Sequence, residues 1–151
     1  MIEAIKKEII VRSKKCNDEI ETIYYGGGTP SLLKTKDIND IYESIENNYR
    51  LSKNPEVTIE ANPDDLTKSK LKSLCTTKIN RISLGIQTLN DDALKFMKRV
   101  HSSKQSIESI ENSLLFFKNL SIDLIYGIPN LGLQSLDKDL RLLQYLSLIH
   151  I

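Results

Sequence analysis

Apolar residues recur along the chain at two alternating spacings, which predict helices and strands in turn. Ile2, Ile5 and Ile9 have the spacing that is typical of one face of an amphipathic helix. Residues 22–25 then form a short β-rich run that ends at three consecutive glycines. The alternation continues and predicts further strands at 55–60, 81–86 and 121–126, helices at 38–49, 67–74, 90–100, 102–117 and 136–143, and a strand beginning at 148–151.

Two of the expected helices carry residues that favour a helix start. Asn90 is of the type that caps a helix N-terminus, and Ser102 and Gln105 have the spacing of a capping box. The first of these helices would carry Ala93, Leu94, Met97 and Val100 on its apolar face. The second would carry a stripe made of Ile107, Ile110, Leu114 and Phe117.

Strand–helix repetition of this kind predicts an α/β fold with a parallel sheet. Four strands and the beginning of another are too few to close a barrel. The chain also opens on a helix with no strand before it, and no linker or second domain is visible. We therefore expect residues 1–151 to form one incomplete domain, the central part of a parallel (β/α) barrel that is cut at both ends.

The expected strands alternate polar and apolar residues, whereas parallel strands that are covered on both faces usually read as continuous apolar runs. The polar face would carry Glu60, Arg81, Gln87 and Asp123 into one shared interior. For any one residue, an internal salt-bridge network or an exposed antiparallel face explains this as well as a bound ligand does. For several residues near the carboxyl ends of strands we favour a ligand, because ligands bind at that edge of parallel sheets.

Composition and charge exclude several classes of function. The net charge is +1, so no charge excess points to nucleic acid, and no apolar run approaches the length of a membrane span. The N-terminus has no signal-peptide core. Cys16 and Cys75 stand far apart with no neighbours at metal-ligand spacing, so we expect free thiols, no metal site and a cytoplasmic protein.

Three glycines directly after a strand let the backbone approach a ligand, although a tight turn is the commoner meaning of such a stretch. The sequence GGGTP at 26–30 fits neither the dinucleotide-binding fingerprint nor a P-loop. With its flanks it reads YYGGGTPSLL at 24–33, and four more stretches follow it along the chain: IEANP at 59–63, NRISLGIQ at 80–87, KRVH at 98–101 and IDLIYGIP at 122–129.

These five stretches, in this order, resemble the radical S-adenosylmethionine (SAM) family that contains the heme chaperone HemW and oxygen-independent coproporphyrinogen III oxidase. The resemblance runs from about residue 2 to residue 143 and implies a partial barrel of the radical SAM type, with SAM held across its strand ends. It implies SAM contacts at Gly27, Gly28, Thr29, Glu60, Gln87, Arg99 and Asp123.

Three of those residues, Glu60, Gln87 and Asp123, are also placed inside by the alternation of the strands. The guanidinium of Arg99 suits the carboxylate of SAM as a bidentate partner. Three of the basic residues also have a simpler explanation than ligand binding. Arg99 alone would be a cation at a helix C-terminus, Arg81 would pair with Glu60 or Asp123, and His101 would be a surface or cap residue without a metal role.

Family members bind a [4Fe-4S] cluster through three closely spaced cysteines, and this sequence has no such segment. The resemblance therefore implies the cluster and heme only in a full-length protein. We expect this chain alone to be inactive in radical chemistry, because three thiolates are needed to hold the cluster.

Three functions stay open. The motifs favour a HemW-like heme chaperone, which would bind heme or a porphyrin and pass heme to an acceptor protein. An oxygen-independent coproporphyrinogen III oxidase of porphyrin biosynthesis is the first alternative. A non-catalytic α/β fragment is the second.

Overall fold

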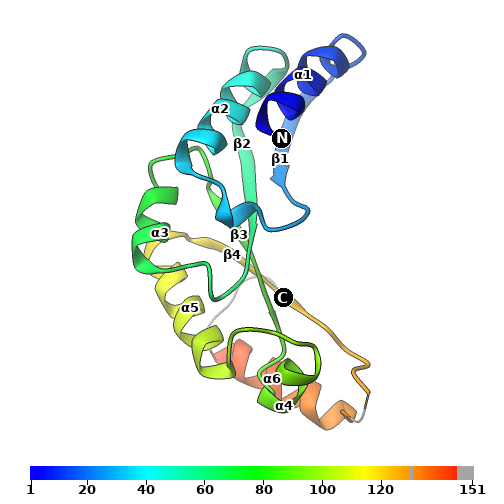
Figure 1. Cartoon of the computed structure of the whole chain (residues 1–151), viewed down its shortest axis with the longest axis vertical. Helices are drawn as coiled ribbons and strands as arrows, with labels where there is room; N and C mark the ends of the chain where they lie inside the picture. The colour runs from blue at the N-terminus through cyan, green and yellow to red at the C-terminus, as the bar shows by residue number, and fades with distance from the viewer. Residues whose placement is uncertain (130, 146–151) are drawn as a thin grey trace.

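The computed structural model describes residues 1–129 and 131–145 and shows a four-stranded parallel sheet in the order β1-β2-β3-β4. The strands are β1 (Glu19–Tyr25), β2 (Arg50–Ala61), β3 (Arg81–Gln87) and β4 (Asn119–Leu124). This confirms the α/β class and excludes an exposed antiparallel face. The edges of β1 and β4 do not meet, so the described part is an open section of a barrel (Figure 1). The strand expected at 148–151 lies outside the described residues.

The expected helices are present, in most cases with shorter bounds. They are α1 (Ile2–Ser13), α2 (Thr35–Glu46), α3 (Lys68–Leu74), α4 (Asp91–Phe96), α5 (Ser103–Phe116) and α6 (Leu133–Tyr145), with a short 3-10 helix, η1 (Pro30–Leu32). Figure 1 shows a crescent in which α2, α3 and α5 follow the convex side and the strands lie inside them. No helix in the described part is long and apolar enough to cross a membrane.

The helix starts agree with the capping residues in the sequence. The Asn90 side chain accepts a hydrogen bond from the Ala93 N–H, and the Ser102 and Gln105 side chains and backbones form a complete capping box. These contacts fix the starts of α4 and α5, because they satisfy N–H groups that have no partner within the helix.

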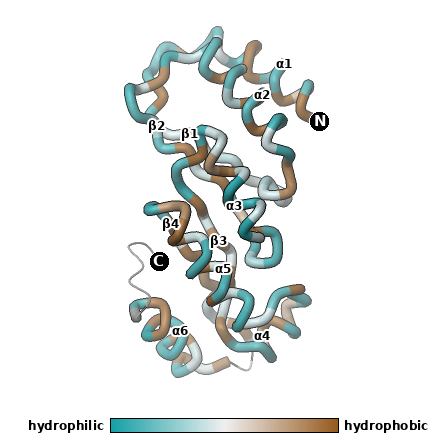
Figure 2. Tube along the Cα trace, turned by 90° about the vertical axis from the view of Figure 1, so that its left-hand side faces the viewer, coloured by the Kyte–Doolittle hydropathy of each residue, from teal (hydrophilic) through white to brown (hydrophobic). Residues whose placement is uncertain are grey.

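The core lies between the sheet and the outer helices. Apolar side chains of the strands pack against those of α2, α3 and α5, and Figure 2 shows hydrophobic residues recurring along the strands in the middle of the molecule. Burial of such a side chain contributes roughly 1.5–3 kcal/mol relative to leaving it exposed. The fully buried side chains of the core include Ile59, Ile82, Leu84, Ile86, Leu71, Leu74 and Ile110.

The apolar stripe expected on α5 was only partly right. Ile110 and Phe117 are buried as expected and Ile107 is half-buried, but Leu114 is exposed. The rest of the buried face of the helix consists of Ser106, Ser109 and Ser113. Small side chains let a helix lie close to its neighbours, and α5 contacts β3, β4 and α3. Periodicity of large apolar residues could not reveal this face, because serine does not count as apolar.

Two further boundaries differ from the expectation. α4 ends at Phe96, because Lys98 takes the left-handed backbone conformation (φ 55°), and Val100 is therefore exposed rather than packed. β2 begins at Arg50 rather than Pro55, and its pairing with β1 shifts register between Ile20 and Thr22. The polar run before Pro55 hid this part of the strand from the pattern.

Candidate functional site

The carboxyl ends of the strands and the loops that follow them border an open polar cavity of about 270 Å³. It contains six of the seven residues expected to contact SAM, so the structure brings Glu60, Gln87 and Asp123 together beside the triple-glycine turn. The cavity is lined by Gly28, Thr29, Pro30, Glu60, Ala61, Asn62, Ser83, Gly85, Gln87, Arg99 and Asp123.

The triple-glycine turn after β1 brings backbone to the rim of this cavity. Gly27 and Gly28 have φ angles of 79° and 58°, which side-chain-bearing residues rarely adopt. The seventh expected residue, Gly27, is not among those that line the cavity. Its N–H instead donates a hydrogen bond of 3.1 Å to Oε2 of Glu60. Gly27 therefore orients a residue of the site.

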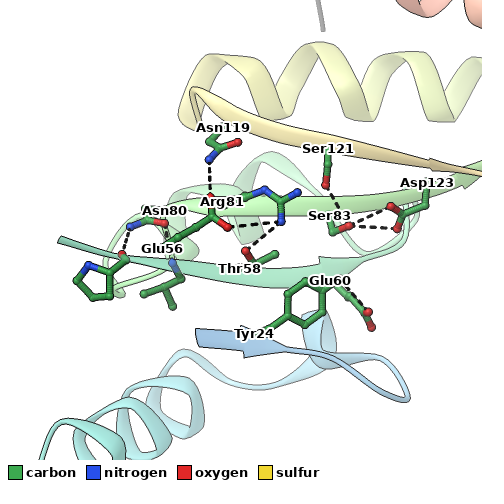
Figure 3. A network of polar contacts seen from close by, with 12 residues as sticks. Tyr24, Glu56, Thr58, Glu60, Asn80, Arg81, Ser83, Asn119, Ser121 and Asp123 are labelled. Atoms are coloured by element: carbon green, nitrogen blue, oxygen red, sulfur yellow. Dashed lines mark hydrogen bonds and ion pairs between the residues drawn. The ribbon is translucent and has the colours of Figure 1, made fainter. Parts of the chain in front are cut away.

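Glu60, at the end of β2, is held from a second side by Tyr24 of β1. The Tyr24 hydroxyl donates to Oε1 of Glu60 at 3.0 Å. Burial raises the pKa of the Tyr24 hydroxyl, and the Glu60 carboxylate raises it further, while a hydrogen bond with Ser83 opposes the shift. Tyr24 is thus kept in the protonated form that can donate, and its hydroxyl orients the carboxyl group of Glu60 (Figure 3).

Asp123 of β4 is the second carboxylate of the cavity, and two serines fix it. Ser83 of β3 lies with its Oγ 3.1 and 3.2 Å from the two Asp123 oxygens, and Ser121 donates to Ser83 Oγ at 3.1 Å. Both serines are buried on the polar side of the sheet (Figure 3). Their position in the strand alternation could have identified them as supports of the site, but no role was expected for them.

Gln87 ends β3 with a left-handed backbone (φ 67°), which turns its side chain back toward the strand. A methyl group at Gly85 would lie 2.6 Å from Nε2 of Gln87. Glycine at position 85 therefore makes room for the amide inside the cavity, a requirement that the sequence pattern did not indicate.

Arg99 supplies the guanidinium of the site from the loop between α4 and α5. The backbone N–H of Arg99 donates to the Leu94 carbonyl at 2.9 Å, and the preceding residue, Lys98, has a left-handed backbone conformation. Within residues 1–129 and 131–145, no carboxylate lies at ion-pair distance from its side chain. The cavity thus combines one cation with the two carboxylates of Glu60 and Asp123, which suits a zwitterionic ligand that also carries hydroxyl groups.

Arg81 lies on the polar face but does not line the cavity. Its Nη1 lies 3.9 Å from Oε1 of Glu56 and 3.2 Å from Oγ1 of Thr58 (Figure 3). The expected pairing of Arg81 with Glu60 or Asp123 is therefore wrong. Arg81 starts β3, whereas the cavity lies at the strand ends. The salt-bridge explanation therefore holds at one end of this face.

The simpler explanation given for His101, a surface or cap residue, is wrong, because the ring is buried and the N-cap of α5 is Ser102. His101 is 3% exposed, and its ring lies between the loop after β2 and the end of β3. A histidine that follows an exposed valine gives no sign of burial in the sequence, because the α4–α5 loop has no regular period.

The residues present do not fit an iron–sulfur cluster. Cys16 and Cys75 are free thiols outside the cavity, and the described residues contain no group of three His, Cys, Asp or Glu side chains that could hold a metal ion. A [4Fe-4S] cluster takes its ligands mainly from thiolates. No step of a reaction can therefore be assigned to a cluster held by these residues.

Comparison with known proteins agrees with this architecture. The sequence profile of the Radical SAM superfamily matches residues 2–143. The chain is 40% identical over 126 residues to the heme chaperone HemW of Buchnera aphidicola from Acyrthosiphon pisum, covering 83% of this chain and 34% of that protein. It is 35% identical over 143 residues to HemW of Bacillus subtilis, covering 93% and 38%.

The fold is shared with coproporphyrinogen III oxidase (HemN) from Escherichia coli, with a TM-score of 0.81 at 24% identity over 96% of this chain and 34% of that one. The chain spans about a third of the length of the curated relatives it matches. Because the superfamily profile covers nearly the whole sequence, the chain belongs to the radical SAM superfamily.

Proposed function

We propose that this chain is the SAM-binding part of a HemW-like heme chaperone. The observation that carries the proposal is the convergence of Glu60, Arg99 and Asp123 on one cavity at the strand ends. Two relatives that are 40% and 35% identical to this chain, both named heme chaperone HemW, support the HemW branch.

The charges of the cavity match those of SAM. Arg99 would bind the α-carboxylate, because a guanidinium is a bidentate partner for a carboxylate. Glu60 and Asp123 would bind the ammonium group or the ribose hydroxyls, because both kinds of group can donate hydrogen bonds to a carboxylate, which only accepts them. The backbone at Gly28 and the side chains of Thr29 and Gln87 would provide further polar contacts.

Heme or porphyrin binding, an acceptor protein and a [4Fe-4S] cluster belong to this proposal only for a longer protein that contains the chain. The printed name of the relatives, heme chaperone HemW, is the support for heme. A cytoplasmic location is part of the same proposal and rests on the sequence.

Isothermal titration of the chain with SAM tests the proposal, with Arg99→Ala as the decisive variant. We expect Arg99→Ala to weaken binding by about tenfold to a hundredfold, since it removes a charge-assisted contact worth about 1.5–3 kcal/mol. Lys95→Ala is the matched control, because it removes an exposed cation of α4 outside the cavity. Equal affinity of wild type and Arg99→Ala removes Arg99 from the site and contradicts the proposal.

A further inference from the structure

His101 is the buried anchor of the loop that carries Arg99. Of residues 97–102, between α4 and α5, only His101 is buried, while Lys98 and Val100 are exposed. The backbone of this loop is otherwise tied to the two helices that flank it, to α4 through the hydrogen bond from the Arg99 backbone N–H to Leu94 and to α5 through the capping box of Ser102. The side chain of His101 is therefore what fastens the loop to the sheet.

The imidazole ring reaches two segments that contribute to the cavity. Nε2 lies 3.3 Å from the carbonyl oxygen of Ile86, the residue before Gln87. Nδ1 lies 3.4 Å from Oδ1 of Asp64, in the loop that begins with the cavity residue Asn62. One side chain thus connects the loop of Arg99 to the ends of β2 and β3.

Both neighbours of the ring are oxygen acceptors, the Ile86 carbonyl and the Asp64 carboxylate, so an N–H on either ring nitrogen has a partner. Among the residues that the structure describes, Asp64 supplies the carboxylate at ion-pair distance from the His101 ring, and the Asp64 side chain is 35% exposed.

We propose that His101, paired with Asp64, is a positioning residue that holds Arg99 in the SAM cavity. It does not line the cavity, so its effect on a ligand is indirect, and the route that we propose is the loop that carries Arg99. This inference rests on the proposed function for its effect on SAM. Its structural part, the anchoring of the loop, does not depend on SAM.

A double-mutant cycle separates positioning from general loosening of the fold. We expect His101→Gln to weaken SAM binding by about threefold to thirtyfold in the wild-type background and by less than about twofold in Arg99→Ala, as is typical of coupled residues. Asp64→Asn is the milder second variant, since Asp64 is partly exposed, and it should follow the same pattern. Equal weakening in both backgrounds overturns the proposal.

Amide hydrogen exchange without SAM tests the anchoring directly. We expect His101→Gln and Asp64→Asn to accelerate exchange at the Arg99 N–H, while the Ile110 N–H in the middle of α5 keeps its rate. Unchanged exchange at Arg99 overturns the proposal whatever SAM does. A wild type that fails to bind SAM contradicts the proposed function instead, and the exchange rates still decide whether His101 anchors the loop.

Discussion

Tyr24 and Glu60 contact each other diagonally across β1 and β2. The register pairs Tyr24 with Thr58, so the Tyr24 hydroxyl reaches forward by two residues to donate to Oε1 of Glu60 at 3.0 Å. The other oxygen of Glu60 accepts the Gly27 N–H. The turn after β1 and the end of β2 are thereby tied to the same carboxylate, and the orientation of Glu60 is fixed before any ligand binds.

Tyr24→Phe removes the hydroxyl and leaves the Gly27 contact in place. We expect SAM affinity to fall by about twofold to tenfold, because Glu60 loses one of the two hydrogen bonds that orient it and keeps the other. Thermal unfolding should change little, because Tyr24 is 55% exposed. Titration calorimetry of the variant beside Tyr49→Phe, a tyrosine outside the cavity, checks this. Equal losses in the two variants contradict the role of Tyr24.

Gly85→Ala should disturb the site more than the fold. The new methyl group would displace Nε2 of Gln87, which is the movable end of a flexible side chain, while the next nearest atom, the Ala61 carbonyl oxygen, lies 3.7 Å away. We expect a folded protein with SAM affinity reduced by about tenfold, since it loses or misplaces one polar contact. Gly132→Ala is the control, because a methyl group there meets nothing within 4 Å. Wild-type affinity in Gly85→Ala would sink the idea.

Stability should fall at alkaline pH because of Tyr25. Burial raises the pKa of its hydroxyl, which donates to the Ile38 carbonyl at 3.1 Å. Above pH about 10 the unfolded chain releases this proton and the folded chain keeps it, so the unfolded state binds fewer protons and unfolding becomes easier as pH rises. Below that pH the contribution of this group is fully present.

Urea unfolding between pH 9 and pH 11 measures this effect, with an upper limit of about 1.4 kcal/mol per pH unit for one group. Tyr25→Phe should flatten the dependence on pH. Tyr126→Phe, which changes an 81% exposed ring, should leave it as in the wild type. If all three proteins share one slope, Tyr25 ionises equally in both states and the prediction is wrong.

The chain treated with iron, sulfide and a strong reductant should yield no 5′-deoxyadenosine from SAM. It has two cysteines, and neither lines the cavity. Product analysis by chromatography and iron content per chain check this together. Cys16→Ser/Cys75→Ser is the matched control and should give the same baseline. Iron-dependent product from the wild type, absent from the control, contradicts the prediction.

The sequence predicted the sheet and most of the cavity for a physical reason. Each strand alternates polar and apolar residues, and side chains two apart share a face, so Glu60, Gln87 and Asp123 had to converge once the strands were parallel. Arg99 came from the family resemblance, because it lies in a loop whose course no periodicity determines.

What the sequence did not predict depends on contacts between distant segments. His101 is buried by Asp64 and Ile86, which stand 37 and 15 residues away in the numbering. Arg81 pairs with Glu56 because of the register between β2 and β3, in which Thr58 lies opposite Arg81. Neither register nor loop path can be read from composition or spacing.

The serine-lined face of α5 has a consequence for the cavity on the other side of the sheet. Ser106 and Ser113 are fully buried, so a branched or aromatic residue at either position would have to displace the helix away from the sheet. α5 starts one residue after Ser102, at the end of the segment that bears Arg99 and His101. We therefore expect a bulkier side chain beneath α5 to shift Ser102 and, with it, the loop that places Arg99 in the cavity, although the serines themselves do not line it.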